Sequence, residues 1–115
     1  MKFDAKTFLS IDFYQQKAEG TAIYPDKGKN PFYPALGLAG EAGEVANKIK
    51  KMMRDGLTKE ELQDTIKGEL SDCMWYIAAL CQEFDLELSD ILAYNLNKLY
   101  DRKDRGVLGG SGDNR

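Results

Sequence analysis

Residues 73–81 read CMWYIAALC, which is the longest apolar run in this chain of 115 residues. The run is too short to cross a bilayer, because a membrane-spanning helix needs about 20 apolar residues. A helix that is apolar on every side is buried all round. We therefore expect residues 73–81 to lie at the centre of a helical bundle. Trp75 and Ala79 are expected to meet another subunit, and packing within one subunit is the alternative.

Helical patterns continue on both sides of this run. They predict helices over residues 4–19, 35–54 and 59–84, and a fourth helix that Ser89 caps and that ends near residue 105. Thr58 and Glu61 fit a capping box at the start of the third helix. Residues 20–34 hold all three prolines and are expected to form a loop. Strand-like alternation is missing, so we expect an all-α fold, a compact bundle of about four helices that oligomerises through its fully apolar helix.

The length and net charge of the chain limit the number of domains and the kinds of partner that we expect. Residues 1–115 are expected to form one domain, in which the glycine-rich tail 106–115 is either mobile or ordered by a ligand. The net charge of −3 argues against a nucleic-acid polymer or a membrane surface as a partner. The N-terminus lacks the apolar segment of a signal peptide, and two cysteines are too few for a disulfide framework. These features predict a cytoplasmic protein.

The chain contains no histidine. This excludes catalytic triads and dyads that need histidine, and it also excludes the usual histidine-containing zinc and di-iron sites. A metal site in this chain would have to be built from oxygen ligands. Such ligands favour a hard cation such as Mg²⁺ or Mn²⁺.

Four carboxylates fall into two pairs with helical spacing. Glu41 and Glu44 lie along one edge of an apolar stripe, and Glu69 and Asp72 lie along the same edge of a stripe in the next helix. The expected stripes are Ala42, Val45, Ala46, Ile49 and Met53 in the first of these helices, and Ile66, Leu70, Cys73, Ile77, Leu80 and Phe84 in the second. Helices packed by these stripes would bring the carboxylates together, where they repel unless a cation lies between them. A solvated acidic face is the alternative for either pair alone.

Two glycines, Gly40 and Gly43, bracket the first of these carboxylates. Glycine inside a helix costs about 1 kcal/mol relative to alanine. Their presence suggests that another helix or a ligand approaches the backbone closely.

The fourth helix supplies positive charge. Leu88, Leu92, Leu96 and Leu99 form its expected core stripe. Asn95, Lys98 and Arg102 follow one another along a polar edge of the same helix, where they could bind phosphate. A solvated basic face is the alternative. Beside a cluster of carboxylates, however, this edge predicts a site for a metal ion and phosphate together.

With these residues in view, the sequence resembles the MazG-like family of all-α nucleoside triphosphate pyrophosphohydrolases. The family signature ExxE, a spacer and ExxD is matched by EAGE at 41–44 and ELSD at 69–72. The NxxKxxxR stripe at 95–102 and the ending GSGDNR at 110–115 are similar to small single-domain and phage-encoded members. The resemblance covers nearly the whole chain.

The resemblance implies an enzyme that cuts (deoxy)nucleoside triphosphates between the α and β phosphates, giving the monophosphate and pyrophosphate through metal-activated water. It implies that Glu41, Glu44, Glu69 and Asp72 bind Mg²⁺, for which Mn²⁺ can substitute. It also implies that Asn95, Lys98 and Arg102 hold the phosphates, and that one carboxylate of the pair Glu41 and Glu44 accepts the proton of the water. A phage-encoded member would act in the host cytoplasm.

The sequence offers several candidates for the nucleoside pocket and two for the oligomeric state. Tyr14, Gln15 and Trp75 are candidates for contact with the nucleoside, and Phe32 and Tyr33 are further candidates. The chain is expected to form a homodimer or homotetramer. One alternative function is a hydrolase of pyrimidine nucleotides such as dUTP or dCTP in the same superfamily. The other is a non-catalytic helical module that binds a metal or a protein partner.

Overall fold

The computed structural model describes residues 2–5 and 10–115 as four helices joined by loops, with no strand in these residues. The helices are α1 (Ile11–Glu19), α2 (Phe32–Asp55), α3 (Lys59–Glu83) and α4 (Leu88–Asp104). This confirms the all-α class and the expected number of helices. None of the helices in the described part of the chain is long and apolar enough to cross a membrane.

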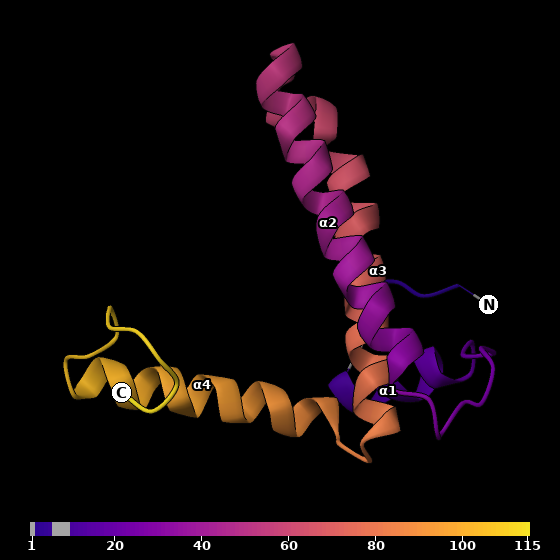
Figure 1. Ribbon diagram of the computed structural model, residues 1–115, viewed down its shortest axis with the longest axis vertical. Helices are drawn as coiled ribbons and strands as arrows, with labels where there is room; N and C mark the ends of the chain where they lie inside the picture. Colours follow the sequence, from indigo (N-terminus) through magenta and orange to yellow (C-terminus); the bar gives the residue numbers. More distant parts are fainter. Residues whose placement is uncertain (1, 6–9) are drawn as a thin grey trace.

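α2 and α3 form an antiparallel hairpin that runs the length of the molecule (Figure 1). α2 ends at Gly56, whose positive φ of 68° is the left-handed conformation that favours glycine at this position. Thr58 then caps α3 as predicted. Its hydroxyl oxygen accepts from the Glu61 N–H at 3.1 Å, and the Glu61 carboxylate accepts from the Thr58 N–H at 3.2 Å.

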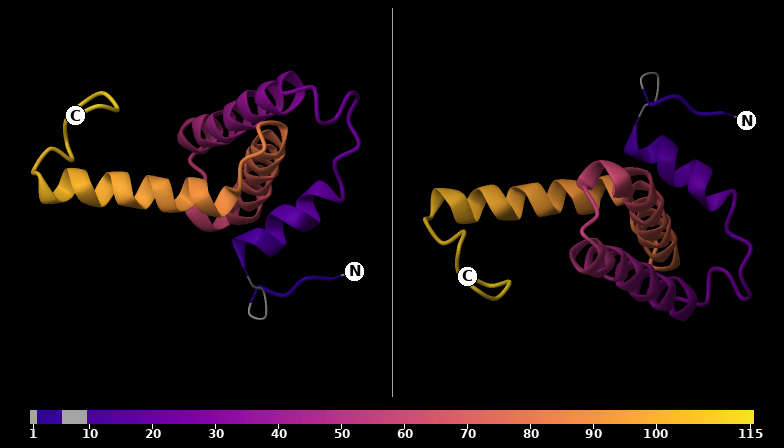
Figure 2. Two further views of the ribbon diagram at one scale, coloured as in Figure 1. Left: turned by 90° about the horizontal axis from the view of Figure 1, so that it is seen from below. Right: turned by 90° about the horizontal axis from the view of Figure 1, so that it is seen from above.

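α1 crosses α3 and closes a small core at the base of the hairpin (Figure 2). This core consists of Ala18, Ala78, Cys81 and Leu88, with Tyr14, Trp75, Ile77 and Ile91 packed against it. Ala79 is also buried within the single chain. The burial of Ala79 fits the alternative, packing within one subunit, whereas the contact of half-buried Trp75 with another subunit stays a prediction.

α4 leaves this core at a steep angle and projects away from the hairpin (Figures 1 and 2). Within the fold it packs mainly on α1. Gln15 fixes its start: the side-chain oxygen accepts from the Leu88 N–H at 2.8 Å, and the side-chain amide donates to Gln82 and to the Leu86 carbonyl. The radius of gyration is 16.9 Å, whereas a compact globular chain of this length has about 13 Å.

Three helix starts differ from the predictions. α1 begins at Ile11, with Ser10 as its cap, and Asp4 and Ala5 are not helical; the rest of the predicted early start, residues 6–9, lies outside the described residues. α2 begins at Phe32, because Pro34 falls in the first turn, where no N–H donor is needed. α4 begins at Leu88, one residue before the predicted cap, because Gln15 from α1 satisfies the Leu88 N–H.

The loop before α2 is held by a single carboxylate of α3. Glu83 accepts hydrogen bonds from the Tyr24 hydroxyl, the Gly28 N–H and the Asn30 N–H. The Asn30 side chain in turn accepts from the Tyr33 N–H at 3.2 Å. These bonds lower the pKa of Glu83, with the Tyr24 hydroxyl as the largest cause, and they fix the angle at which α2 begins.

The predicted apolar stripes are only partly covered in one chain. The α2 residues with low exposure are Pro34, Gly37, Leu38, Glu41, Val45, Asn47, Lys48, Lys51 and Met52. Ala42, Ala46, Ile49 and Met53 of the expected stripe are exposed instead, so α2 is rotated relative to the prediction. Leu70 of α3 and Leu92 and Leu96 of α4 are exposed as well.

Candidate functional site: a carboxylate cluster between α2 and α3

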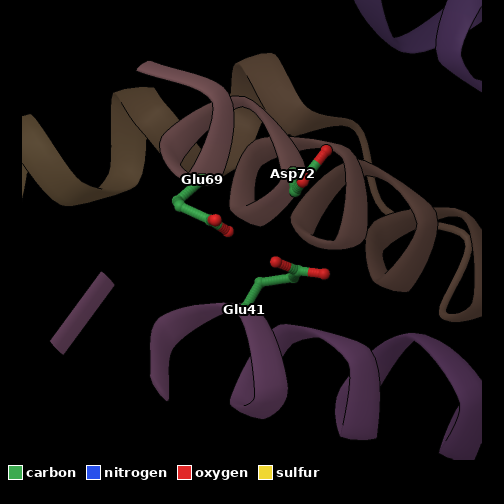
Figure 3. Close-up of side chains that lie close together, drawn as sticks. All are labelled: Glu41, Glu69 and Asp72. Atoms are coloured by element: carbon green, nitrogen blue, oxygen red, sulfur yellow. The ribbon is translucent and has the colours of Figure 1, made fainter. Parts of the chain in front are cut away.

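Three carboxylates converge between the two long helices (Figure 3). Glu41 comes from α2, and Glu69 and Asp72 come from successive turns of α3. One oxygen from each lies within 4.8 Å of the others. Glu41 and Glu69 are half-buried and Asp72 is exposed, so the cluster is open to solvent on one side. The antiparallel hairpin brings together groups that are 28 residues or more apart in the sequence.

The charges in this cluster are not neutralised by the fold. None of the ion pairs found among residues 2–5 and 10–115 involves these carboxylates. Burial raises the pKa of Glu41 above its ordinary value, and the hydrogen bond with Glu69 and the negative charges of Asp72, Glu69 and Glu44 raise it further. Carboxylates in this state favour a proton or a cation between them. The donor set, three carboxylate oxygens and no nitrogen or sulfur, fits a hard divalent cation.

Glu44 stands outside the converging group. Its side chain is exposed, and it acts on the cluster through its charge near Glu41. The predicted set of four carboxylates thus becomes a cluster of three with Glu44 on the adjacent turn of α2.

A tyrosine that the sequence analysis did not select borders the cluster. Burial raises the pKa of Tyr76, and neighbouring Tyr33, Glu41 and Asp72 contribute to the same shift. The ring packs against Gly37 of α2, where a Cβ atom would lie 2.1 Å from the tyrosine Cε1. Helical spacing could have identified Tyr76, because it follows Glu69 and Asp72 along one face of α3. This spacing did not single out Tyr76, because residues 73–81 are apolar on nearly every side of the helix.

Gly40 and Gly43 do not face another helix of this chain. A Cβ atom at either position would meet nothing within 4 Å. Within the described residues another helix approaches closely at Gly37 instead, and the approach of a ligand to Gly40 and Gly43 stays a prediction.

The phosphate-binding candidates on α4 lie apart from the carboxylates. Lys98 and Arg102 are held by the C-terminal tail: the Asp113 carboxylate lies 3.4 Å from Lys98 Nζ and 3.2 Å from Arg102 Nη2. Arg102 is buried under this tail, and Asn95 is exposed. Because α4 projects away from α2 and α3, one chain does not bring these three residues to Glu41, Glu69 and Asp72 (Figure 1).

The tail itself has a defined path beside the end of α4. Arg115 donates hydrogen bonds to the carbonyl oxygens of Val107, Leu108 and Gly112, and Arg105 donates to the Arg115 carbonyl. These hydrogen bonds hold the tail against the end of α4, and ordering of the tail by a ligand stays a prediction. Asp113 occupies the position on Lys98 and Arg102 where a phosphate was expected.

The residues predicted to contact the nucleoside lie in different surroundings. Gln15 uses its amide group to hold α4, and Tyr14 packs against the core, where burial raises its pKa. Trp75 donates from Nε1 to the Thr21 hydroxyl at 2.8 Å and lines a cavity of about 320 Å³. Phe32 and Tyr33 are exposed at the start of α2.

This cavity lies between α1, the loop before α2 and α3. Its walls are Ala18, Glu19, Ala22, Tyr24, Lys27, Gly28, Trp75, Ala78, Ala79, Gln82, Glu83 and Asp85. Trp75 stands one helical turn after Asp72, and its ring packs edge-on against Tyr76, with centroids 5.1 Å apart. None of the three converging carboxylates lines the cavity, and Trp75 is the wall residue nearest to them along α3. The cavity offers aromatic walls together with polar groups.

Comparison with known proteins assigns this arrangement to a family. The profile of the MazG nucleotide pyrophosphohydrolase domain matches residues 34–107, a segment that contains both carboxylate pairs and the basic edge of α4. The chain belongs to the MazG family. The Gene 37 protein of Mycobacterium phage L5 is 49% identical to this MazG chain over 114 residues, which cover 93% of the chain and 100% of the phage protein. No solved structure matches the chain significantly.

Proposed function

We propose that this MazG protein hydrolyses nucleoside triphosphates between the α and β phosphates, releasing the monophosphate and pyrophosphate, with Mg²⁺ as its divalent ion. The observation that carries the proposal is the convergence of Glu41, Glu69 and Asp72 in a chain of a nucleotide pyrophosphohydrolase family. When bound there, the divalent ion supplies positive charge against the triphosphate and makes water more acidic. The three carboxylates would hold it, and Mn²⁺ would substitute.

Glu44 is the candidate general base. It is exposed on the turn of α2 that follows Glu41, and it is not among the carboxylates whose oxygens converge. A carboxylate in this position remains free to accept the proton of the attacking water. Asn95, Lys98 and Arg102 would bind the phosphates and stabilise the charge of the departing pyrophosphate.

The cavity beside Trp75 is the proposed site for the base of the nucleotide. Trp75 and Tyr24 offer rings against which a base can pack, and Gln82 offers hydrogen-bonding groups. Self-association into a homodimer or homotetramer belongs to the same proposal, because one chain alone leaves the cations of α4 away from the carboxylates.

Two substitutions separate the proposed roles of the carboxylates. Glu41→Gln is expected to reduce both the affinity for Mn²⁺, measured by calorimetry, and the rate of hydrolysis. Glu44→Gln is expected to retain Mn²⁺ binding and to lose turnover by about a hundredfold or more, as for loss of a general base. Glu60→Gln, an exposed carboxylate in the first turn of α3, is the matched control and should change neither. Full activity of Glu44→Gln would contradict its assignment as the base.

Trp75 also gives a direct test of the cavity, because it is the single tryptophan of the chain. Its fluorescence should change on titration with a non-hydrolysable triphosphate analogue, and much less with inorganic triphosphate, which has no base. Equal responses to both would place the base elsewhere.

A further inference from the structure

The backbone at the start of α4 fixes the orientation of the Gln15 amide group. Gln15 is only 8% exposed. Its side-chain oxygen accepts from the Leu88 N–H at 2.8 Å, and its amide nitrogen donates to the Leu86 carbonyl at 2.9 Å. A backbone N–H can only donate and a carbonyl oxygen can only accept, so the two ends of this amide group cannot be exchanged.

The orientation of Gln82 follows from that of Gln15. The Gln15 amide nitrogen also donates to Gln82, whose side-chain oxygen accepts at 3.0 Å. The reverse orientation of Gln82 would set two N–H groups against each other and leave the buried donor of Gln15 unpaired. The amide nitrogen of Gln82 is therefore turned away from Gln15, and among the described residues it donates to no protein group.

Gln82 lines the cavity of about 320 Å³ beside Trp75, where other side-chain donors are already used. The indole N–H of Trp75 and the hydroxyl of Tyr24 both donate to protein oxygens. The Lys27 ammonium group remains, but it contacts the carbonyl oxygen and the carboxylate of Glu19. The Gln82 amide nitrogen is thus the side-chain donor of the cavity that the fold orients and leaves unused.

The carboxylates of the same walls are less available to a ligand. Glu83 accepts three hydrogen bonds from the loop before α2. Glu19 lies 3.8 Å from Lys27 Nζ, and Asp85 is exposed in the turn after α3. The cavity therefore favours a ligand that presents an acceptor to Gln82.

Nucleotide bases differ in the group that they present at one ring position. Uracil has a carbonyl oxygen at position 4 where cytosine has an amino group, and hypoxanthine has a carbonyl oxygen at position 6 where adenine has an amino group. The oxygen can accept from an amide nitrogen, whereas the amino group would set two donors against each other. A site that donates one hydrogen bond at this position can therefore distinguish the two kinds of base.

We propose that Gln82 selects nucleotides whose base carries a carbonyl oxygen at position 4 of a pyrimidine or position 6 of a purine, and that Gln15 is the positioning residue for this selection. The inference rests on the proposed function, which places the base beside Trp75. A second cavity, of about 510 Å³, also borders Gln82, but its walls contain no aromatic side chain. Packing of a base against a ring favours the cavity beside Trp75.

Two matched pairs of substrates test the selection, UTP against CTP and ITP against ATP. We expect kcat/KM to be about tenfold higher for UTP and for ITP than for their amino counterparts. Gln82→Met removes both polar groups at similar length and should bring these ratios to about one. Gln82→Glu still accepts from Gln15 but replaces the free donor by an acceptor, so the ratios should invert. Gln63→Glu, an exposed glutamine of α3, makes the same change of charge and should leave the ratios unchanged.

A substitution of Gln15 tests its positioning role. Gln15→Glu keeps an oxygen for the Leu88 N–H but presents only acceptors to Gln82. The Gln82 amide group should then reverse and present its oxygen to the cavity, so the preference for UTP over CTP should be lost. Circular dichroism checks that each variant keeps its helical content. A full preference for UTP in folded Gln15→Glu would refute the positioning role, because a merely structural contribution would not change this ratio.

Binding separates this inference from the proposed function. The fluorescence of Trp75 gives the Kd of non-hydrolysable UTP and CTP analogues without turnover. If no triphosphate is hydrolysed but the UTP analogue binds about tenfold more tightly, the proposed function fails and the selection stands. If hydrolysis occurs with equal kcat/KM for both members of each pair, or if Gln82→Met leaves a preference unchanged, the selection by Gln82 is overturned while the proposed function stands.

Discussion

Replacing Gly37 by alanine should loosen the hairpin at the point where it supports the carboxylate site. The added Cβ atom would lie 2.1 Å from Tyr76 Cε1, whereas carbon atoms in contact are normally about 3.5–4.0 Å apart. Either the Tyr76 ring or the backbone of α2 must therefore move by more than an ångström. Tyr76 borders Glu41 and Asp72, so this movement also disturbs the carboxylates.

The magnitude follows from two opposing effects. Extra volume in a packed interface costs about 1–3 kcal/mol, and alanine recovers up to about 1 kcal/mol because it favours a helix more than glycine does. The free energy of unfolding should fall by about 1–2 kcal/mol, which lowers the Tm of a domain of this size by about 4–8 °C.

Thermal and guanidinium unfolding measure this change, and Gly68→Ala is the matched control. Gly68 also lies inside a helix, but a Cβ atom there meets nothing within 4 Å. That variant should be as stable as the unmodified chain or more stable by up to about 1 kcal/mol. If Gly37→Ala and Gly68→Ala change the stability equally, the close packing of Tyr76 on α2 is refuted.

Three further predictions concern the site, the tail and the loop before α2. Glu69→Gln should weaken Mn²⁺ binding in calorimetry with little change in Tm, and unchanged binding would remove this residue from the metal site. Asp113→Asn removes the carboxylate that contacts Lys98 and Arg102, so KM for the triphosphate should fall a few-fold at constant kcat; a rise in KM would mean that Asp113 positions these cations instead. The pKa of Glu83 is lowered in the folded chain, so its stabilising contribution is present at neutral pH and is lost as the pH falls through the lowered pKa. Unfolding experiments over this acidic range should show a weaker pH dependence for Glu83→Gln than for the unmodified chain, and equal slopes would contradict the assignment.

Local chemistry made much of the fold predictable from the sequence. The capping box at Thr58 and Glu61 occurs where predicted, and Gly56 lies in the short gap predicted between the helices over residues 35–54 and 59–84. Both features involve residues within a few positions of one another. The convergence of Glu41 with Glu69 and Asp72 was also predictable, because the two pairs have helical spacing in helices joined by a short turn.

Contacts between distant parts of the chain were not predictable. Gln15 caps α4 from 73 positions away, and no local pattern distinguishes such a glutamine from one that contacts a ligand. Glu83 anchors the loop before α2 in the same way. These side chains acquire their roles only once the helices have packed.

The rotation of α2 has a different physical cause. Apolar periodicity shows which face of a helix avoids water but not which surface covers it. Ile49 and Met53 lie on the apolar face of α2, and this face is left bare by α3. The prediction treated the partner of this face as the next helix in the chain, but α3 leaves Ile49 and Met53 largely exposed.

Product analysis by ³¹P NMR shows directly which phosphate bond of the substrate is cleaved. The purified protein would be incubated with Mg²⁺ and each ribo- and deoxyribonucleoside triphosphate in turn, with Glu44→Gln as the control for contaminating phosphatases. We expect signals of the monophosphate and pyrophosphate in equal amounts, and the order of substrates would identify the preferred base. Orthophosphate together with the diphosphate would contradict cleavage between the α and β phosphates.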